Sequence, residues 1–152
     1  MIRESISKLV ERIDLEGKEA EEAMKEIMGG SATPAQIASF LTALRMKGET
    51  IEEISACARI MREFSIKIHP KVNGAITDIV GTGGDLKKTF NVSTTSMFVL
   101  AGAGMPVAKH GNRSASSSCG SADVLEELGL DLTIQPQKVQ DCIERLGVGF
   151  MF

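Results

Sequence analysis

The sequence predicts an α/β protein in which an amino-terminal helical lobe is followed by the start of a parallel-sheet α/β domain that is truncated. Two patterns predict this fold. Residues 1–68 carry apolar stripes at helical spacing, whereas residues 75–152 alternate short apolar runs with helical stripes. The chain has 152 residues, of which 43% are hydrophobic, enough to bury a normal core. We assign residues 69–74 as the hinge between the two parts.

Short helices with tight connections are expected in residues 1–68. The first two have the apolar stripes Ile6, Leu9, Val10 and Ile13, then Ala20, Ala23, Met24, Ile27 and Met28. Gly29-Gly30 ends the second helix. Capping boxes predict the next two starts, at Thr33-Pro34-Ala35-Gln36 and at Thr50-Ile51-Glu52-Glu53. Their stripes are Ile37, Phe40, Leu41 and Leu44, ended by Gly48, and Ile54, Cys57, Ala58 and Met61.

Strands and helices are expected to alternate in residues 75–152. The predicted strands are Ile76–Val80, Pro106–Ala108 and Val148–Phe152. The predicted helices run from about Val92 to Ala103, from Ser121 to Leu128, and from near Pro136, with Val139, Cys142, Ile143 and Leu146 apolar. This order favours a parallel sheet with right-handed crossovers. Because so few parallel strands rarely make a complete sheet, we expect a fragment, or a chain whose sheet another chain completes.

Composition excludes several classes of function. The net charge of −3 and the absence of Trp and Tyr argue against a nucleic-acid partner. No apolar run approaches the ~20 residues that span a bilayer, so no membrane partner is expected and a cytoplasmic location is predicted. The three cysteines lack metal-ligand spacing. We expect Cys57 and Cys142 in the core and Cys119 in a loop.

A glycine-rich loop, Gly81-Thr82-Gly83-Gly84-Asp85, follows the first predicted strand. Such a loop lets backbone N–H groups surround an anion, although a simple tight turn explains it equally well. A dinucleotide fingerprint is excluded because Leu86 stands where a third glycine is needed, and because the next strand ends in Lys109-His110 instead of an acid. A Walker A loop is excluded because Gly-Lys-Ser/Thr is absent.

A second polar loop, residues 109–121, follows the next strand and lies beside the first loop if the strands are parallel neighbours. Four basic residues and no acid occur between Leu86 and Ala122. The bases are Lys87, Lys88, Lys109 and Arg113, and the nearby hydroxyls are Thr89, Ser93, Thr94, Thr95, Ser96, Ser114, Ser116, Ser117, Ser118 and Ser121. Asn91 could merely cap its helix, and His110 could be structural. Together these features predict a phosphate or pyrophosphate site that includes a helix amino terminus.

Four motifs together resemble the anthranilate phosphoribosyltransferases, over essentially the whole chain. They are Gly81–Asp85, Asn91-Val92-Ser93-Thr94, Lys109-His110-Gly111-Asn112-Arg113-Ser114 and Gly120-Ser121-Ala122-Asp123-Val124-Leu125-Glu126. The resemblance implies transfer of phosphoribosyl from 5-phosphoribosyl 1-pyrophosphate (PRPP) to anthranilate, with release of pyrophosphate, in tryptophan biosynthesis. It also implies Mg²⁺ as cofactor and a homodimer formed through the helical lobe. Catalysis would rest on positioning and on stabilising the leaving pyrophosphate, without a side-chain nucleophile or acid–base residue.

The resemblance also implies a set of site residues. For PRPP these are Gly81, Gly84, Asp85, Thr89, Asn91, Val92, Ser93, Thr94, Lys109, His110, Gly111, Asn112, Arg113, Ser114, Ala115, Ser116, Ser117 and Ser121. Gly81 and Asn112 would also face anthranilate, and Ser93 would bind the metal.

The chain departs from the family in length. Family members continue well beyond Phe152, where their Asp-Glu pair for magnesium and an arginine for anthranilate's carboxylate lie, and no adjacent Asp-Glu pair follows Phe64 here. We interpret Glu126-Glu127 as a solvated helix face. The chain alone is therefore expected to be weak or inactive. Two alternatives stay open: an enzyme like the pyrimidine nucleoside phosphorylases, and a non-catalytic dimerising module.

Overall fold

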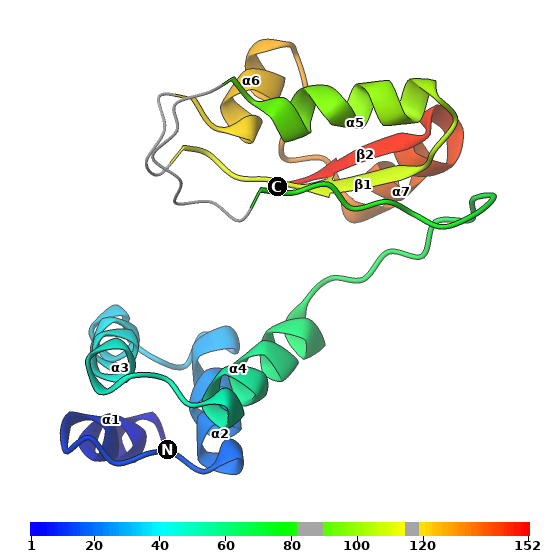
Figure 1. Cartoon of the computed structure of the whole chain (residues 1–152). Coiled ribbons are helices and arrows are strands. Elements are labelled where there is room, and N and C mark those ends of the chain that lie inside the picture. Colours follow the sequence, from blue (N-terminus) through cyan, green and yellow to red (C-terminus); the bar gives the residue numbers. More distant parts are fainter. Residues whose placement is uncertain (82–89, 115–118) are drawn as a thin grey trace. The chain divides into compact units, whose positions relative to one another are not determined.

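A computed structural model describes residues 1–81, 90–114 and 119–152. The chain forms two compact units, Met1–Ser65 and Ile66–Phe152, which we call the helical unit and the α/β unit (Figure 1). The division falls slightly before the predicted boundary at residue 68. No helix in the described ranges is long and apolar enough to cross a membrane.

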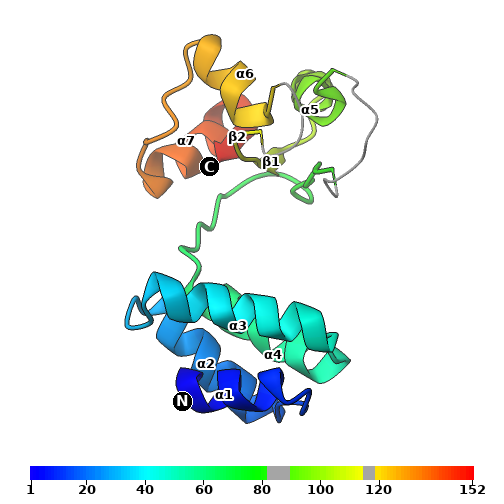
Figure 2. The ribbon, with the colours of Figure 1, turned by 90° about the vertical axis from the view of Figure 1, so that its left-hand side faces the viewer.

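The helical unit contains α1 (Ile2–Val10), α2 (Gly17–Met28), α3 (Pro34–Lys47) and α4 (Ile51–Phe64). Both predicted capping boxes are confirmed: the Thr33 hydroxyl accepts from the Gln36 amide and the Thr50 hydroxyl from the Glu53 amide. The expected ends of α2 and α3, at Gly29 and Gly48, are also confirmed. Helix α1 packs against α3, and α2 against α4 (Figure 2).

The apolar face predicted for α4 is wrong. Ile54 and Met61 are more than half exposed, whereas Glu53, Ala56 and Ile60 are buried. The small side chain of Ala56 shares one core with Ala20 and Ala23 of α2, which brings the two helices close and leaves bulkier residues outside. The stripe predicted for α1 is half confirmed: Leu9 is buried and Ile6 packs against the same core, but the helix ends at Val10, and both Val10 and Ile13 are exposed.

A buried ion pair joins the ends of α3 and α4. The Glu53 carboxylate accepts hydrogen bonds from the Leu15 amide (2.9 Å), the Thr50 amide (2.8 Å) and Lys47 Nζ (2.9 Å). Lys47 Nζ also lies 2.7 Å from a carboxylate oxygen of Asp14. Burial alone would lower the pKa of Lys47, but the bonds to Asp14 and Glu53 outweigh it and raise the pKa. Burial opposes ionisation of Glu53 too, yet its hydrogen bonds bring the pKa below its ordinary value.

The α/β unit is built on two parallel strands, β1 (Val107–His110) and β2 (Val148–Met151), so the predicted parallel pairing is confirmed. Its helices are α5 (Val92–Gly102), α6 (Ser121–Glu127) and α7 (Pro136–Leu146). The predicted strand Ile76–Val80 is reduced to one bridge, between Thr77 and Val107. Among the described residues β2 pairs only with β1, so its other edge is open.

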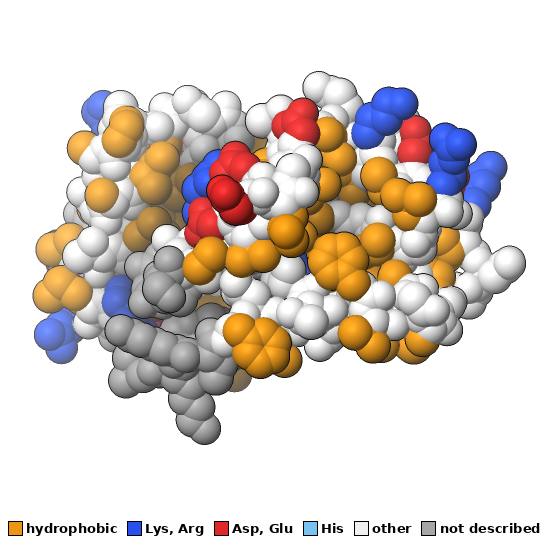
Figure 3. Space-filling view, turned by 90° about the horizontal axis from the view of Figure 1, so that it is seen from above, with side chains coloured by type: hydrophobic (Ala, Val, Ile, Leu, Met, Phe, Trp, Pro, Cys, Tyr) orange, Lys and Arg blue, Asp and Glu red, His pale blue; other side chains and the backbone are white. Residues whose placement is uncertain are grey.

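A second core lies between the sheet and its helices. Its buried members are Met97, Val107, Ala122, Leu125 and Phe150. Helix α5 is apolar on all sides and keeps Phe98 and Val99 exposed; Figure 3 shows hydrophobic side chains exposed on this side of the unit. A helix that is apolar all round is typical of a buried position.

Three apolar positions differ from expectation. Cys142, like Cys57 in the helical unit, is only partly buried, and Leu146 is mostly exposed. Cys119 is exposed, in a loop as predicted.

Candidate phosphate-binding site

Three segments meet at one end of the α/β unit: the start of α5, the residues that follow β1, and the start of α6 (Figure 1). Lys109 Nζ, from β1, lies 3.3 Å from the Ser93 hydroxyl of α5. The Asn112 carbonyl, just beyond β1, accepts from the Ala122 amide of α6 at 3.2 Å. The carboxyl ends of parallel strands are where ligands bind in open α/β sheets. The predicted site residues of these three segments therefore do come together.

Lys109 is the buried cation of this site, with 2% of its surface exposed. Its ammonium group donates to the Ile79 carbonyl (2.9 Å), to the Ser93 hydroxyl and to the His110 carbonyl (3.4 Å). No acid of the described residues forms an ion pair with it. Burial lowers the pKa of Lys109, and the charge of Asp78 opposes this only in part. Such a charge favours an anion supplied from outside.

The start of α5 adds two polar side chains, those of Asn91 and Thr94. Within the described residues the Asn91 side chain makes no cap hydrogen bond, so the simple capping role considered for it is wrong. The Thr94 hydroxyl is buried and has no hydrogen-bond partner in the part of the chain that the structure describes. The first-turn amides of a helix also lack intrahelical partners and attract anions. This helix start thus suits a phosphate.

The residues after β1 lie very close to the start of α6. A Cβ atom on Gly111 would lie 2.2 Å from the Ser121 hydroxyl and 2.6 Å from the Phe150 ring. A Cβ atom on Gly120 would lie 2.4 Å from the Ser114 amide nitrogen. Only glycine fits at either position without a shift of the chain.

Asp123, near the start of α6, was not among the predicted site residues. One of its carboxylate oxygens accepts hydrogen bonds from the Ser114 amide (3.0 Å) and from the Gly120 amide (2.8 Å). These two bonds lower the pKa of Asp123. The sequence offers one signal, an acid at the third position of a helix, but that pattern predicts only a cap.

Arg113 is already occupied by acids of α6. Its guanidinium group binds both carboxylate oxygens of Glu126, at 2.6 and 2.9 Å, and lies 3.2 Å from Asp123. It also lies over the Phe152 ring, 5.8 Å from its centre. These carboxylates raise the pKa of Arg113, and Arg113 lowers that of Glu126. The excess of positive charge predicted from the sequence is therefore partly neutralised in the structure, because Asp123 and Glu126, just after the acid-free stretch, pair with Arg113.

The residues predicted to bind PRPP fall partly inside and partly outside the described parts of the chain. Those in described parts of the chain are Gly81, Asn91, Val92, Ser93, Thr94, Lys109, His110, Gly111, Asn112, Arg113, Ser114 and Ser121. Gly84, Asp85, Thr89, Ala115, Ser116 and Ser117 lie outside the described residues, as do Lys87 and Lys88.

The described side chains offer few ligands for a magnesium ion. Among the described residues there is no group of three or more His, Cys, Asp or Glu side chains that could hold a metal ion. Ser93 offers one hydroxyl oxygen, and that oxygen already faces the Lys109 ammonium. The described side chains therefore do not make a metal site by themselves.

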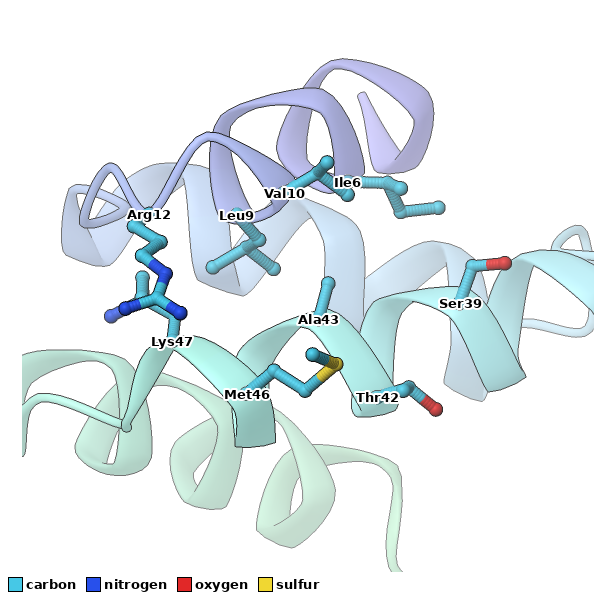
Figure 4. Close-up of a pocket in the computed structure, with 9 residues that line it drawn as sticks. All are labelled: Ile6, Leu9, Val10, Arg12, Ser39, Thr42, Ala43, Met46 and Lys47. Atoms are coloured by element: carbon cyan, nitrogen blue, oxygen red, sulfur yellow. The ribbon is translucent and has the colours of Figure 1, made fainter.

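The helical unit has a groove of about 340 Å³ between α1 and α3 (Figure 4). It is lined by Ile6, Leu9, Val10, Arg12, Ser39, Thr42, Ala43, Met46 and Lys47. Its lining mixes apolar side chains with the polar ones of Arg12, Ser39, Thr42 and Lys47, and Lys47 is already paired with Asp14 and Glu53.

Comparisons with known proteins match both units. Residues 3–65 match the helical bundle domain of a glycosyl transferase family, and residues 73–152 match the α/β domain of the same family. The anthranilate phosphoribosyltransferases of Geobacter sulfurreducens and Methanocorpusculum labreanum are 53% and 55% identical to the chain, each over all of it and over 47% and 45% of the relative. The chain thus spans just under half the length of these relatives.

Two solved structures are similar as well. One is the anthranilate phosphoribosyltransferase of Thermus thermophilus, with a TM-score of 0.80 and 47% identity, over 97% of this chain and 45% of that one. The other is the enzyme of Saccharomyces cerevisiae in complex with PRPP and Mg, with a TM-score of 0.80 and 28% identity, over 99% of this chain and 46% of that one.

Proposed function

Since the chain belongs to the glycosyl transferase family whose helical-bundle and α/β domains it matches, we propose that it forms part of an anthranilate phosphoribosyltransferase. That enzyme would transfer the phosphoribosyl group of PRPP to anthranilate in tryptophan biosynthesis. The observation that carries the proposal is Lys109, a buried ammonium group with neutral partners at the strand ends, beside the start of α5. The names of the relatives supply the substrates.

The reaction needs an anion site more than it needs a nucleophile. The amine of anthranilate forms a bond to C1 of the ribose while the bond from C1 to the pyrophosphate oxygen breaks. Pyrophosphate leaves with the bonding electrons, and the amine loses one proton. Charge develops on the leaving group, so a preorganised cation and backbone amides beside it lower the barrier. Lys109, whose ammonium group lies 3.3 Å from the Ser93 hydroxyl, and the first-turn amides of α5 would supply that cation and those donors.

We assign PRPP to the described residues Gly81, Asn91, Val92, Ser93, Thr94, Lys109, His110, Gly111, Asn112, Arg113, Ser114 and Ser121, and anthranilate to Gly81 and Asn112. Arg113 would have to exchange a carboxylate partner for a phosphate. Mg²⁺ would help neutralise the pyrophosphate. Ser93 would supply one oxygen to an ion that phosphates and water mainly hold, as is common for Mg²⁺.

We also propose that the protein forms a homodimer through the helical unit. Several large apolar side chains of that unit are more than half exposed: Val10, Leu41, Met46, Ile51, Ile54 and Met61. Apolar surface of this kind is typical of an interface. The cytoplasmic location stays a prediction.

The test is an assay of the whole protein with PRPP, anthranilate and Mg²⁺. Loss of anthranilate fluorescence, matched by pyrophosphate release, is the expected result, with omission of PRPP as the control. The absence of turnover in the whole protein would refute the proposal. The 152-residue chain by itself is expected to show weak turnover or none.

A further inference from the structure

The residues that follow β1 are shaped by contacts with the first turn of α6. One oxygen of Asp123 accepts both the Ser114 amide and the Gly120 amide, at 3.0 and 2.8 Å. The other oxygen faces Arg113 at 3.2 Å. A single side chain therefore holds the main chain at Ser114 beside the start of the helix.

Other contacts of the same turn act in the same direction. The Asn112 carbonyl accepts from the Ala122 amide (3.2 Å) and from the Ser121 hydroxyl (3.4 Å). Gly120 lies so close to Ser114 that no side chain fits between them. The backbone of residues 112–114 thus follows the surface of α6, with Asp123 as its charged anchor.

The Asp123 carboxylate is a strong acceptor for the Ser114 and Gly120 amides. A carboxylate oxygen bound to backbone amides forms charge-assisted bonds, which are shorter and stronger than neutral ones. Asp123 is only partly exposed, whereas Glu126, the main partner of Arg113, is 48% exposed at its side chain and contacts no amide of the loop among the described residues. Asp123 and Glu126 therefore have different roles: Asp123 holds the main chain, and Glu126 holds the Arg113 side chain.

We propose that Asp123 is a positioning residue of the PRPP site, which holds the main chain of residues 112–114 in the conformation that receives the diphosphate. The proposal rests on the proposed function. Asp123 itself does not touch the substrate; it acts through Asn112, Arg113 and Ser114. Small misplacements of a binding loop can reduce rates strongly, so loss of this anchor should weaken use of PRPP.

The experiment compares three variants of the whole protein. Asp123→Ala removes the acceptor of both amides, and we expect KM for PRPP to rise about tenfold or more, with KM for anthranilate changed much less. Asp123→Asn keeps an oxygen for the two amides, so it should restore most of the affinity for PRPP. Glu127→Gln changes an exposed acid of the same helix that is neither the acceptor of the two amides nor a partner of Arg113, so it should stay within about twofold of the parent.

Thermal unfolding and calorimetry with PRPP and Mg²⁺ complete the test. If Asp123→Ala does not fold, Asp123→Glu, which displaces the oxygen by one methylene group, takes its place with the same expected rise in KM. An unchanged KM for PRPP in the folded variant, or an equal effect of Glu127→Gln, would overturn the role of Asp123. If the parent protein binds PRPP but shows no turnover, only the proposed function is refuted, and PRPP binding by the variants then tests the role of Asp123. If the parent protein does not bind PRPP, both proposals are refuted.

Discussion

Among the described residues, each unit has one lysine with a buried side chain, and the two lysines have opposite surroundings. The side chain of Lys47 in the helical unit is 3% exposed, and Lys109 in the α/β unit is 2% exposed. Lys47 is held by the carboxylates of Glu53 and Asp14, whereas Lys109 is held by two carbonyls and a hydroxyl. The pKa of Lys47 is raised, and that of Lys109 is lowered.

The difference separates a charge that is paired within the fold from the charge that we propose binds a ligand. The charge of Lys47 is neutralised within the protein, so its removal leaves Glu53 buried without its cation. The charge of Lys109 has no anionic partner among the described residues, so the fold gains little from it. A buried ammonium group of that kind is explained by a ligand that brings negative charge.

The largest effect is expected for Glu53→Ala. It removes the acceptor of Lys47 and of the Leu15 and Thr50 amides, and should lower the free energy of unfolding of the helical unit by about 3–5 kcal/mol. Urea denaturation followed by circular dichroism measures this. The neighbouring change Glu52→Ala, which loses one exposed bond to Gly17, should cost less than about 1 kcal/mol. Equal losses of stability in the two variants would show that the buried pair of Glu53 and Lys47 contributes no more than an exposed hydrogen bond.

The second prediction concerns Lys109→Met in the whole protein. We expect kcat/KM for PRPP to fall about 100-fold, because a cation beside the leaving group is lost. The free energy of unfolding should change by about 1 kcal/mol or less, since an unpaired buried charge is removed together with its hydrogen bonds. Lys71→Met, at an exposed lysine of the same unit, is the matched control and should leave both quantities unchanged. A large loss of stability with normal kinetics would show that Lys109, like Lys47, stabilises the fold and does not bind PRPP.

The third prediction concerns the tight packing of Gly111, just after β1. Gly111→Ala places a methyl group against Ser121 and Phe150, and should lower the free energy of unfolding of the α/β unit by about 1–3 kcal/mol and weaken PRPP binding. Gly102→Ala, where nothing lies within 4 Å of the added atom, should be neutral or slightly stabilising. Thermal unfolding and calorimetry distinguish the two; tolerance of Gly111→Ala would contradict the tight packing after β1.

The smallest effects are expected from pH. If PRPP binds at Lys109 as proposed, the bound form needs a protonated lysine, so affinity should weaken as pH rises through the lowered pKa of Lys109, which lies below the ordinary 10.5. Calorimetry above about pH 7.5, where phosphates are already ionised, tests this. Lys109→Met should remove the dependence, and a parent whose affinity is flat up to about pH 10, near the ordinary pKa of a lysine, would contradict it.

Stability should respond to pH in opposite directions. The contribution of Lys47 is present below 10.5 and is lost as pH rises through its raised pKa. That of Glu53 is present above 4.5 and is lost as pH falls through its lowered pKa. Without ligand, Lys109 makes the α/β unit more stable as pH rises between its lowered pKa and 10.5.

Much of the fold was predictable because local rules decide it. Thr33 and Thr50 start their helices through their own hydroxyls, and Gly48 ends one through its backbone freedom. The buried face of α4 was not predictable, since Ala56 is buried by the way in which α2 approaches. A helical stripe cannot distinguish a core from an exposed apolar surface.

The site was predictable in its ligand-facing half. Lys109 and Ser93 stand at a strand end and a helix start, where parallel topology brings them together. Asp123 was missed because its bond to Ser114 joins residues nine apart in the sequence, a separation that no periodic pattern predicts. The pairing of Arg113 with Glu126 was missed for the same reason, since both looked like ordinary exposed charges.

The open edge of β2 has a consequence for handling the 152-residue chain. On that edge no strand of the described residues pairs with β2, and its N–H and C=O groups can pair with a strand from another molecule, as open sheet edges commonly do. Exposed Phe152 and the apolar surface of α5 lie in the same unit and would hold such a pair together. Solutions of this chain should therefore cloud or gel with increasing concentration, and work on it belongs in dilute, cold samples in which the helical unit can still be studied.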